Sequence, residues 1–343
     1  MKKILLLIFI LFITGCSTRY SVNIKAIQAA KVSDPAIKNI AVLPFKHDTV
    51  SQSSQIESVL NNLYIDGHKY FNVVDRKDLK QILKEKKLDY SGLVNVINTK
   101  FGIKQVDSII IGSVNVDKVS TSYFRAKRTD YNSCAEYRTV HYKNGKSSTY
   151  CVRHRTYTVP CTKKEYNLQT SIKILKVANA QTIFSKVYNE STFYTHCSDD
   201  RFTLPSKEEV NSRLAKYIAQ KFIRDIAPHY VNYYVTLLDD LDVDIDDDEK
   251  LFNATLKLIK LNRIKKANQI LVSLLNKYPN SYVITYDTAI TYEALGKLDT
   301  AKRLLLKAEN LSLKDGKVIE EIENALKRVN HNIQELKRAK KQL

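Results

Sequence analysis

The N-terminus restricts where this chain can fold more than any other feature does. Lys2 and Lys3 precede an apolar run over residues 4–13, which is too short to cross a bilayer as a helix. A basic start followed by a short apolar run is typical of a targeting segment for export. The run ends in Ile13-Thr14-Gly15-Cys16, where two small residues precede a cysteine. We therefore expect the rest of the chain to fold outside the cytoplasm.

This tetrapeptide has the form of a bacterial lipoprotein signal, with Cys16 as the lipidated residue. Thr14 and Gly15 are small enough to let a peptidase reach the bond before Cys16, and the Cys16 thiol can accept a diacylglycerol group. Two or three acyl chains anchor a protein permanently, because each buried CH₂ contributes about 0.8 kcal/mol. Ser17 follows in place of the Asp that retains lipoproteins in the inner membrane, so the prediction is an outer-membrane lipoprotein facing the periplasm. A conventional signal peptide is the alternative.

Length and charge set the remaining bounds. A chain of 343 residues is expected to form two domains. Its net charge of +19 would suggest nucleic acid in the cytosol, but export argues against that partner. In the periplasm the same charge would act on lipid headgroups, anionic cell-wall polymers or acidic secreted proteins, and a merely solvated Lys-rich surface is the simpler alternative.

The alternation of apolar residues predicts an α/β domain over residues 37–230. Strands are expected at residues 37–45, 71–74, 106–119, 166–177 and 182–195, and helices at residues 51–63, around 79–83, at 93–101 and after the Ser206 to Glu209 capping box. Gly112 within a β-branched run suggests a bulge or a close backbone approach. The predicted architecture is a mixed sheet flanked by helices, preceded by a signal peptide at 1–15 and a lipidated tether at 16–36.

Residues 120–164 differ in kind from this domain and are interpreted as an insertion. They are rich in Tyr, Arg and Lys, and Asn144-Gly145 predicts a hairpin turn. They carry Cys134, Cys151 and Cys161, and Cys197 follows the next strand. An even number of cysteines in an exported chain predicts disulfides. Zinc is the competing reading, since His141, His154 and His196 lie nearby, but no zinc-type spacing is present.

The strand register predicts which cysteines pair. If residues 166–177 and 182–195 form a hairpin, Cys161 comes within one residue of Cys197, which suits a disulfide after a small bulge. Cys134 and Cys151 are then left to pair. A strict two-residue turn at Asn144-Gly145 would set Cys151 opposite Arg138, so that hairpin must be irregular.

An acidic stretch over residues 231–249 is predicted to link this domain to a second one. Asp240, Asp242, Asp244 and Asp246 alternate as in a calcium loop, but the Gly and Glu that such a loop needs are missing. We interpret the stretch as a charged linker, with weak calcium binding left open.

Residues 250–343 show an internal repeat of about 34 residues. Leu258, Ala267 and Leu271 recur as Tyr292, Ala301 and Leu305. This period resembles that of tetratricopeptide units, and a last helix from about residue 317 to 340 would cap the stack. The prediction is an all-α, tetratricopeptide-like domain, with an ordinary helical hairpin bundle as the alternative.

Several stretches together resemble the curli-production (CsgG) lipoprotein family. They are the lipoprotein signal, residues 40–45, residues 71–79, the run Ile111-Gly112-Ser113-Val114 and residues 168–184. The resemblance implies a periplasmic α/β domain that assembles into an outer-membrane secretion ring, to which each subunit contributes two long amphipathic hairpins. The Arg-rich insertion stands in place of the first hairpin, and almost no chain stands in place of the second. The family's fold is therefore expected here, and its pore is not.

The sequence predicts a non-enzymatic assembly or scaffold protein of the envelope. No catalytic triad, metal spacing or phosphate loop stands out, and no cofactor is expected. The helical repeats are the expected surface for a protein partner, with Tyr286 and Tyr292 as candidate contacts, although Tyr292 equally suits core packing. A homo-oligomer is possible within this reading. A curli-type secretion-pore subunit and a cell-wall synthase activator are the alternatives.

Overall fold

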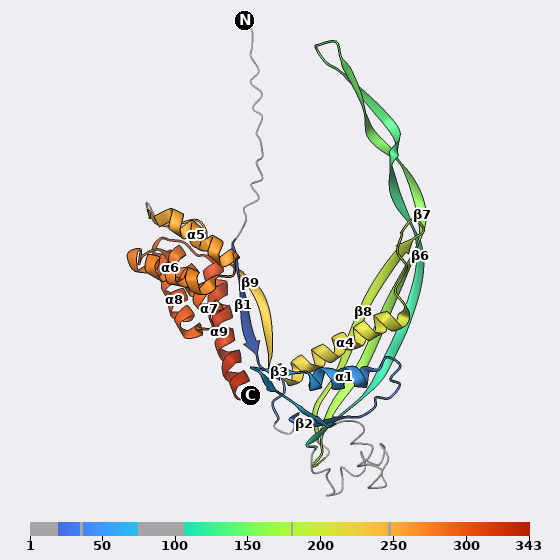
Figure 1. Ribbon diagram of the computed structural model, residues 1–343, viewed down its shortest axis with the longest axis vertical. Helices are drawn as coiled ribbons and strands as arrows, with labels where there is room; N and C mark the ends of the chain where they lie inside the picture. The colour runs from blue at the N-terminus through green and yellow to red at the C-terminus, as the bar shows by residue number, and fades with distance from the viewer. Residues whose placement is uncertain (1–19, 35–36, 75–105, 180, 246–247) are drawn as a thin grey trace. The chain divides into compact units, whose positions relative to one another are not determined.

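The computed structural model describes residues 20–34, 37–74, 106–179, 181–245 and 248–343 (Figure 1). The described chain divides into two compact units. Residues 30–227 form the first, here the sheet unit, and residues 20–29 with 228–343 form the second, here the helical unit. Cys16 and the helices predicted around 79–83 and 93–101 lie outside the described residues.

The sheet unit is built on a five-stranded mixed sheet, as predicted. Its strand order is β5-β2-β6-β7-β8. β2 runs parallel to both of its neighbours, whereas β6, β7 and β8 form an antiparallel meander. The strands are β2 (Asn39–Val42), β5 (Asn72–Val74), β6 (Ser108–His141), β7 (Ser147–Lys176) and β8 (Thr182–Cys197), and a two-residue pair is formed by β3 (Tyr64–Ile65) and β4 (His68–Lys69).

Two helices share the core with this sheet: α1 (Gln52–Asn61) and α4 (Lys207–Ile226). The Ser206 hydroxyl accepts a hydrogen bond from the backbone N–H of Glu209 at 3.1 Å, so the predicted cap at the start of α4 is confirmed. Ile56, Ile172 and Phe222 are fully buried between the layers. This packing holds in place the parts of β7 and β8 that lie within the sheet.

Another part of the chain, the Phe45 ring, comes close to Gly112. The predicted alternative, a bulge, lies two residues further along β6. A Cβ atom at Gly112 would come within 2.3 Å of the Phe45 ring, so only glycine fits there. The register of β6 against β7 shifts between Val114 and Val116.

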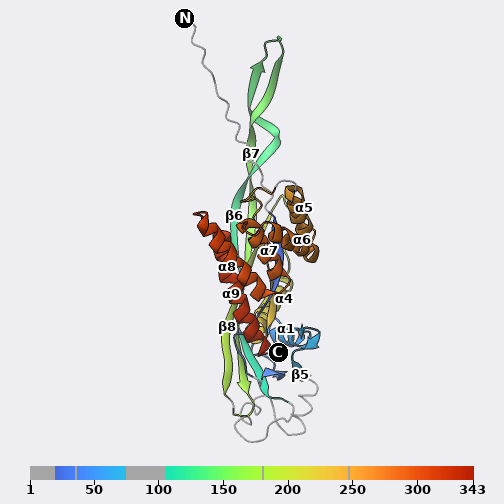
Figure 2. The same cartoon turned by 90° about the vertical axis from the view of Figure 1, so that its left-hand side faces the viewer.

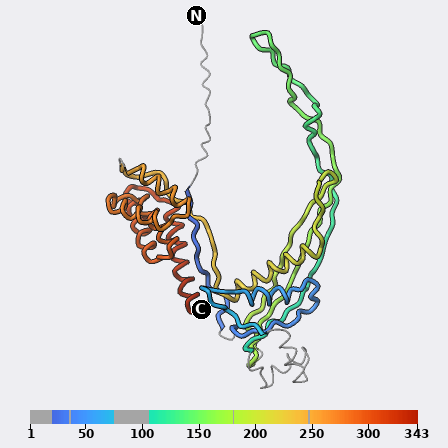
Figure 3. The backbone as a smooth tube through the Cα atoms, in the orientation of Figure 1, coloured from blue at the N-terminus to red at the C-terminus, as the bar shows by residue number. Residues whose placement is uncertain are grey.

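The helical unit begins with a strand where a tether was predicted. β1 (Ser21–Gln28) pairs along its whole length with β9 (His229–Thr236) in antiparallel fashion, as Figure 3 lets the reader follow. Val22 and Ile24 are buried in the same core as the C-terminal helices. The predicted tether and the first part of the predicted linker are therefore one ribbon of the second unit. The stretch predicted to be all-α, residues 250–343, is helical in the structure.

Five helices complete the helical unit: α5 (Glu249–Lys260), α6 (Ile264–Lys277), α7 (Tyr282–Ala294), α8 (Leu298–Lys314) and α9 (Glu320–Lys340). The turns after α5 and α7 repeat the same geometry 34 residues apart. Asn262 and Gly296 both have positive φ, at 58° and 74°. The N–H of Arg263 donates to the Leu258 carbonyl and that of Lys297 to the Tyr292 carbonyl, each at 2.9 Å. The predicted period is thus present in the backbone.

A residue of the acidic stretch caps α7, and not α5, which is the helix that follows the stretch directly. The Asp242 carboxylate accepts hydrogen bonds from the Ser281 hydroxyl and from the backbone N–H groups of Tyr282 and Val283 at the start of α7. A carboxylate is favoured there because the first N–H groups of a helix lack partners and carry partial positive charge. Both of its oxygens are therefore committed within the chain.

Candidate functional site

The most unusual surface of the molecule is a long two-stranded arm, defined here as residues 122–162. β8 ends opposite Cys161, but β6 and β7 continue to pair with each other as far as His141 and Ser147. Figure 2 shows this ribbon extending past the rest of the sheet. The predicted insertion is thus a direct continuation of two core strands. A two-stranded ribbon has no interior, so nearly all of its side chains face solvent.

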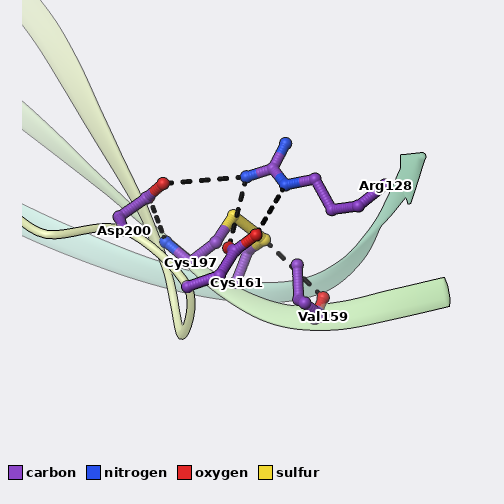
Figure 4. A network of polar contacts seen from close by, with 6 residues as sticks. Arg128, Val159, Cys161, Cys197 and Asp200 are labelled. Carbon is purple, nitrogen blue, oxygen red and sulfur yellow. Dashed lines mark hydrogen bonds and ion pairs between the residues drawn. A yellow bond between two sulfur atoms is a disulfide. The ribbon is translucent and has the colours of Figure 1, made fainter. Parts of the chain in front are cut away.

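A disulfide and an ion pair fix the base of the arm. Cys161 lies directly opposite Cys197 in the register and is bonded to it, as predicted. The Arg128 guanidinium donates to Asp199 at 3.0 Å and lies 3.7 Å from Asp200, whose carboxylate accepts the N–H of Cys197 (Figure 4). The Asp199 carboxylate raises the pKa of Arg128 and its own pKa is lowered in return. The residues that follow β8, Asp199 and Asp200, are thereby held against the arm.

The second disulfide joins the two strands higher in the arm. Cys134 and Cys151 are bonded with their Cα atoms 5.8 Å apart, so both predicted pairs are confirmed. The register is irregular at several points between Asp130 and Tyr137, and Cys151 lies opposite Tyr137. All four sulfur atoms are used in disulfides, which leaves no thiolate among them for the alternative zinc site.

The two faces of the lower arm carry different chemistry. Paired residues of antiparallel strands share a face, and successive residues alternate. Asp130 and Arg128 therefore lie on the face that carries the Cys161–Cys197 disulfide. The opposite face has no carboxylate along this regular stretch. We call it the basic face and define it by Tyr123, Arg125, Lys127, Thr129, Thr156, Thr158, Thr162 and, on β8, His196.

A shallow depression of about 500 Å³ lies at the base of the arm. Tyr123, Arg125, Pro160, Thr162 and His196 contribute to its lining. The Arg125 guanidinium donates to the Thr158 hydroxyl at 3.1 and 3.2 Å, which holds its charge in a defined position over the strand. Tyr123 is 81% exposed. The depression thus combines an oriented cation with an accessible aromatic ring.

In the helical unit, the predicted contact residue Tyr286 is a core residue. Only 1% of it is exposed, and its hydroxyl donates to the Thr236 carbonyl at 2.9 Å. Burial raises its pKa. The prediction that Tyr286 contacts a partner directly is therefore wrong, because α7 is buried on nearly every side. Tyr292 is partly buried against the same core, with the Lys297 ammonium 5.6 Å from its ring centre.

The same unit holds a buried ion pair that sequence reasoning missed. Glu293 on α7 accepts two hydrogen bonds from Arg328 on α9, at 2.9 and 2.8 Å, and its side chain is fully buried. Tyr233 on β9 donates to Glu293, and Asn332 donates to the Tyr233 hydroxyl. Burial raises the pKa of Tyr233 to about 12. A bidentate pair with all partners present is the geometry that a buried charge requires.

Asp287, six residues before Glu293 on α7, is buried without a cation. One carboxyl oxygen accepts the N–H of Leu238 at 3.0 Å, and the other has no hydrogen-bond partner. Burial raises its pKa well above the usual value. Burial thus favours the neutral form of this carboxyl group, and its hydrogen bond with Leu238 ties α7 to the segment after β9.

A second depression, of about 480 Å³, lies where α6 begins beside the end of α7. Arg263, Lys265 and Lys266 line it together with Ala294 and Leu295. Leu261, next to it in sequence, is 70% exposed. Basic and apolar groups are thus accessible at one end of the helical hairpins.

Within the described ranges, no group of three or more His, Cys, Asp or Glu residues is arranged to hold a metal ion. No described helix is both long enough and apolar enough to cross a membrane.

Comparison with known proteins gives only distant similarity. No protein-family model matches the sequence, and no curated protein matches it. Among solved structures, the lipoprotein GNA1162 from Neisseria meningitidis aligns with a TM-score of 0.25 at 10% identity, over 54% of this chain and 97% of that one. The PelC dodecamer from Paraburkholderia phytofirmans aligns with a TM-score of 0.21 at 12% identity, over 58% of this chain and 94% of that one. Similarity at this level assigns neither a fold nor a function.

Proposed function

We propose that this protein is a lipid-anchored component of the outer membrane that faces the periplasm and acts as an assembly scaffold, without catalysis. The Ile13-Thr14-Gly15-Cys16 motif supports the anchor. The two disulfides suit an oxidising compartment such as the periplasm. The arm and the helical hairpins both offer surface for contacts with other molecules.

The observation that carries the scaffold role is the repeated hairpin of the helical unit. Ala267 and Ala301 are fully buried at equivalent positions, as are Leu271 and Leu305, and the turn geometry repeats with the same period. This supports a tetratricopeptide-like pair of units capped by α9. Such stacks bind peptides or helices of other proteins on their exposed surfaces.

We place the partner surface at the depression beside the start of α6, in place of Tyr286. Lys265 and Lys266 are exposed there, and a partner segment with carboxylate side chains would complement them. Leu261 would supply apolar contact at the edge of the same surface.

Site-specific photo-crosslinking in living cells tests this role. A photo-reactive residue at position 265 is expected to give discrete adducts with one protein. A matched probe at position 327, an exposed lysine on α9, is expected to give none. Equal adduct patterns at both positions, or none at either, would reject the proposed surface. Cys16→Ser in the same strain is expected to remove the protein from the outer-membrane fraction and to weaken the adducts.

The arm gives a specific reason to keep a secretion-pore subunit as the second candidate. Its two strands occupy the place of the first hairpin in the curli-production family, although their charge differs from what a lipid-facing hairpin needs. The size of the protein purified in mild detergent separates the candidates. A large ring would favour the pore, and a monomer favours the scaffold. Stimulation of a purified cell-wall synthase would favour the activator alternative instead.

A further inference from the structure

The arm concentrates positive charge that the protein itself does not neutralise. Residues 122–162 contain eight Lys and Arg residues against two Asp and Glu residues. Arg128 is paired with Asp199, and Arg153 with Glu136. Within the described part of the chain, the other six have no ion pair, and they are Arg125, Lys127, Arg138, Lys143, Lys146 and Arg155. Uncompensated charge on an exposed ribbon attracts anions from solution.

These cations are distributed along the arm and do not converge on one point. Arg125 and Arg138 lie 13 positions apart in β6, which is on the order of 40 Å at the rise of a β-strand. Lys143 and Lys146 lie beyond them at the turn. No single small anion could contact this set. An extended polymer with repeated negative charges could contact all of them together.

The uncharged groups of the arm indicate which polymer. Three threonines, Thr156, Thr158 and Thr162, face the same side as Arg125 and Lys127. The arm as a whole carries six tyrosines, of which Tyr123 lies on this face, and Tyr123, Tyr131 and Tyr137 are each more than 60% exposed. Hydroxyl groups hydrogen-bond with other hydroxyl groups, and flat aromatic rings pack against flat ring surfaces. Sugars present both kinds of partner.

A bilayer fits this surface less well. Val152 is the only exposed large aliphatic residue of the arm and Phe124 its only exposed phenylalanine, and the other exposed rings are tyrosines with a polar hydroxyl, so few side chains suit deep insertion between lipids. A two-stranded ribbon also twists strongly, which turns its faces away from any one plane along its length. A flexible chain can follow such a twist.

We propose that the arm binds an anionic polysaccharide, one that carries carboxylate or phosphate groups, with Arg125, Lys127 and Arg138 as principal contacts. The depression at the base would hold one sugar unit between the Tyr123 ring and the Arg125 guanidinium. This binding does not depend on the scaffold role of the helical unit, so the two proposals can fail separately.

The test compares two charge-matched triple variants of the full-length protein in non-ionic detergent. Arg125→Gln, Lys127→Gln and Arg138→Gln remove three charges from the arm. Lys118→Gln, Lys173→Gln and Lys216→Gln remove three charges from exposed positions outside it. The probe is polygalacturonate, and neutral dextran is the control polymer. Disulfide mapping and circular dichroism confirm that each variant is folded.

The wild type is expected to bind polygalacturonate with an affinity that falls steeply as salt rises, and not to bind dextran. The arm triple is expected to lose about tenfold in affinity at low salt and to show a smaller salt dependence. The control triple is expected to stay within about twofold of the wild type. Tyr123→Ala is expected to weaken binding severalfold without changing the salt dependence.

Three results would overturn the proposal. Equal losses in the two triples would mean that only the overall charge matters. Preference for phosphatidylglycerol-containing micelles over the polysaccharide, lost in the arm triple, would assign the arm to a membrane surface. No binding of polygalacturonate by the wild type would remove the site altogether.

Discussion

The helical hairpins and the arm are both antiparallel pairs joined by tight turns, but different forces hold them together. In the helical unit, Leu271 and Leu305 are fully buried and the hairpins share one apolar core. In the arm, six tyrosines and eight cations line a two-stranded ribbon. The Cys134–Cys151 disulfide joins its two strands, and the Cys161–Cys197 disulfide ties its base to β8. An isolated two-stranded hairpin is only marginally stable in water. Covalent bridges therefore take the place that burial has in the helical unit.

The largest loss of stability is expected when the buried ion pair of the helical unit is broken. Arg328→Met removes the partner of a fully buried carboxylate, and it is expected to destabilise the helical unit by about 3–5 kcal/mol. Arg138→Met, on the arm, removes an exposed cation and is expected to change stability by less than about 0.5 kcal/mol. Urea unfolding followed by hydrogen exchange in each unit measures both. A small effect of Arg328→Met would mean that the Glu293 carboxylate does not depend on this ion pair for its burial.

Removal of the upper disulfide is expected to rank second and to act locally. Cys134→Ser with Cys151→Ser frees a loop of 17 residues, and the bridge is expected to contribute about 2–4 kcal/mol to the order of the arm. The helical unit shares no core with the arm, so its stability should not change. Limited proteolysis should cut the variant between residues 134 and 151 first. Protection of that stretch without the bridge would show that strand pairing alone suffices.

Two buried carboxyl groups are expected to give opposite pH dependence in the two units. Burial raises the pKa of Asp287, so the contribution of this group to the stability of the helical unit is fully present below the usual aspartate pKa and is lost as pH rises through the folded value. Burial also disfavours the Asp225 carboxylate in the sheet unit, yet hydrogen bonds from Lys186, Lys31 and Tyr188 hold its pKa below the usual value. The contribution of Asp225 to the stability of the sheet unit is therefore present above the usual aspartate pKa, and it is lost as pH falls through the lower pKa of the folded state.

Unit-resolved hydrogen exchange between pH 3 and pH 7 would measure this difference. Asp287→Asn is expected to remove the loss of stability on going to neutral pH, and Asp225→Asn the loss on acidification. The same direction of change in both units would contradict the assignment of these two groups.

The smallest change in stability is expected for a substitution at an exposed tyrosine of the arm, compared with one at a buried leucine of the helical unit. Tyr137→Ala, at a position 66% exposed on the arm, is expected to change stability by less than about 0.5 kcal/mol. Leu305→Ala, at a fully buried position of the helical unit, is expected to cost about 2–5 kcal/mol. Thermal unfolding of the two variants compares them directly. Similar costs would mean that Tyr137 packs in an assembly that the isolated chain does not show.

The sequence predicted best where local periodicity decides the structure. Strand alternation and the hairpin turn together placed Cys161 within one residue of Cys197 and left Cys134 for Cys151, because register follows from counting residues away from a turn. A register shift between Ile174 and Leu175 brings Cys161 directly opposite Cys197. The capped start of α4 and the 34-residue period of the helical hairpins are equally local signals. They depend on residues within one element or one repeat.

Contacts between residues far apart in the chain could not be predicted from the sequence. β1 pairs with β9 across roughly 200 residues, so its alternating Val22 and Ile24 had no visible partner. Glu293 and Arg328 lie on different helices, and their pairing depends on packing. Tyr286 was predicted to contact a partner because the helical repeats were the expected binding surface, and the polar residues of α7 gave no sign that this helix is buried. In the structure the hydroxyls of Thr285 and Thr288 donate to carbonyls of the preceding turn, which lets a polar helix be buried.

The contrast between the arm and the helical unit is tested most directly by hydrogen exchange of the intact protein with and without reductant. Reduction is expected to accelerate exchange in β6 and β7 between residues 124 and 160, where Cys134–Cys151 joins the two strands and Cys161–Cys197 ties the base to β8. Exchange in α5 to α9 should remain unchanged, because these helices contain no disulfide and are held by their buried core. Unchanged protection of the arm after complete reduction would contradict the claim that disulfides take the place of burial there.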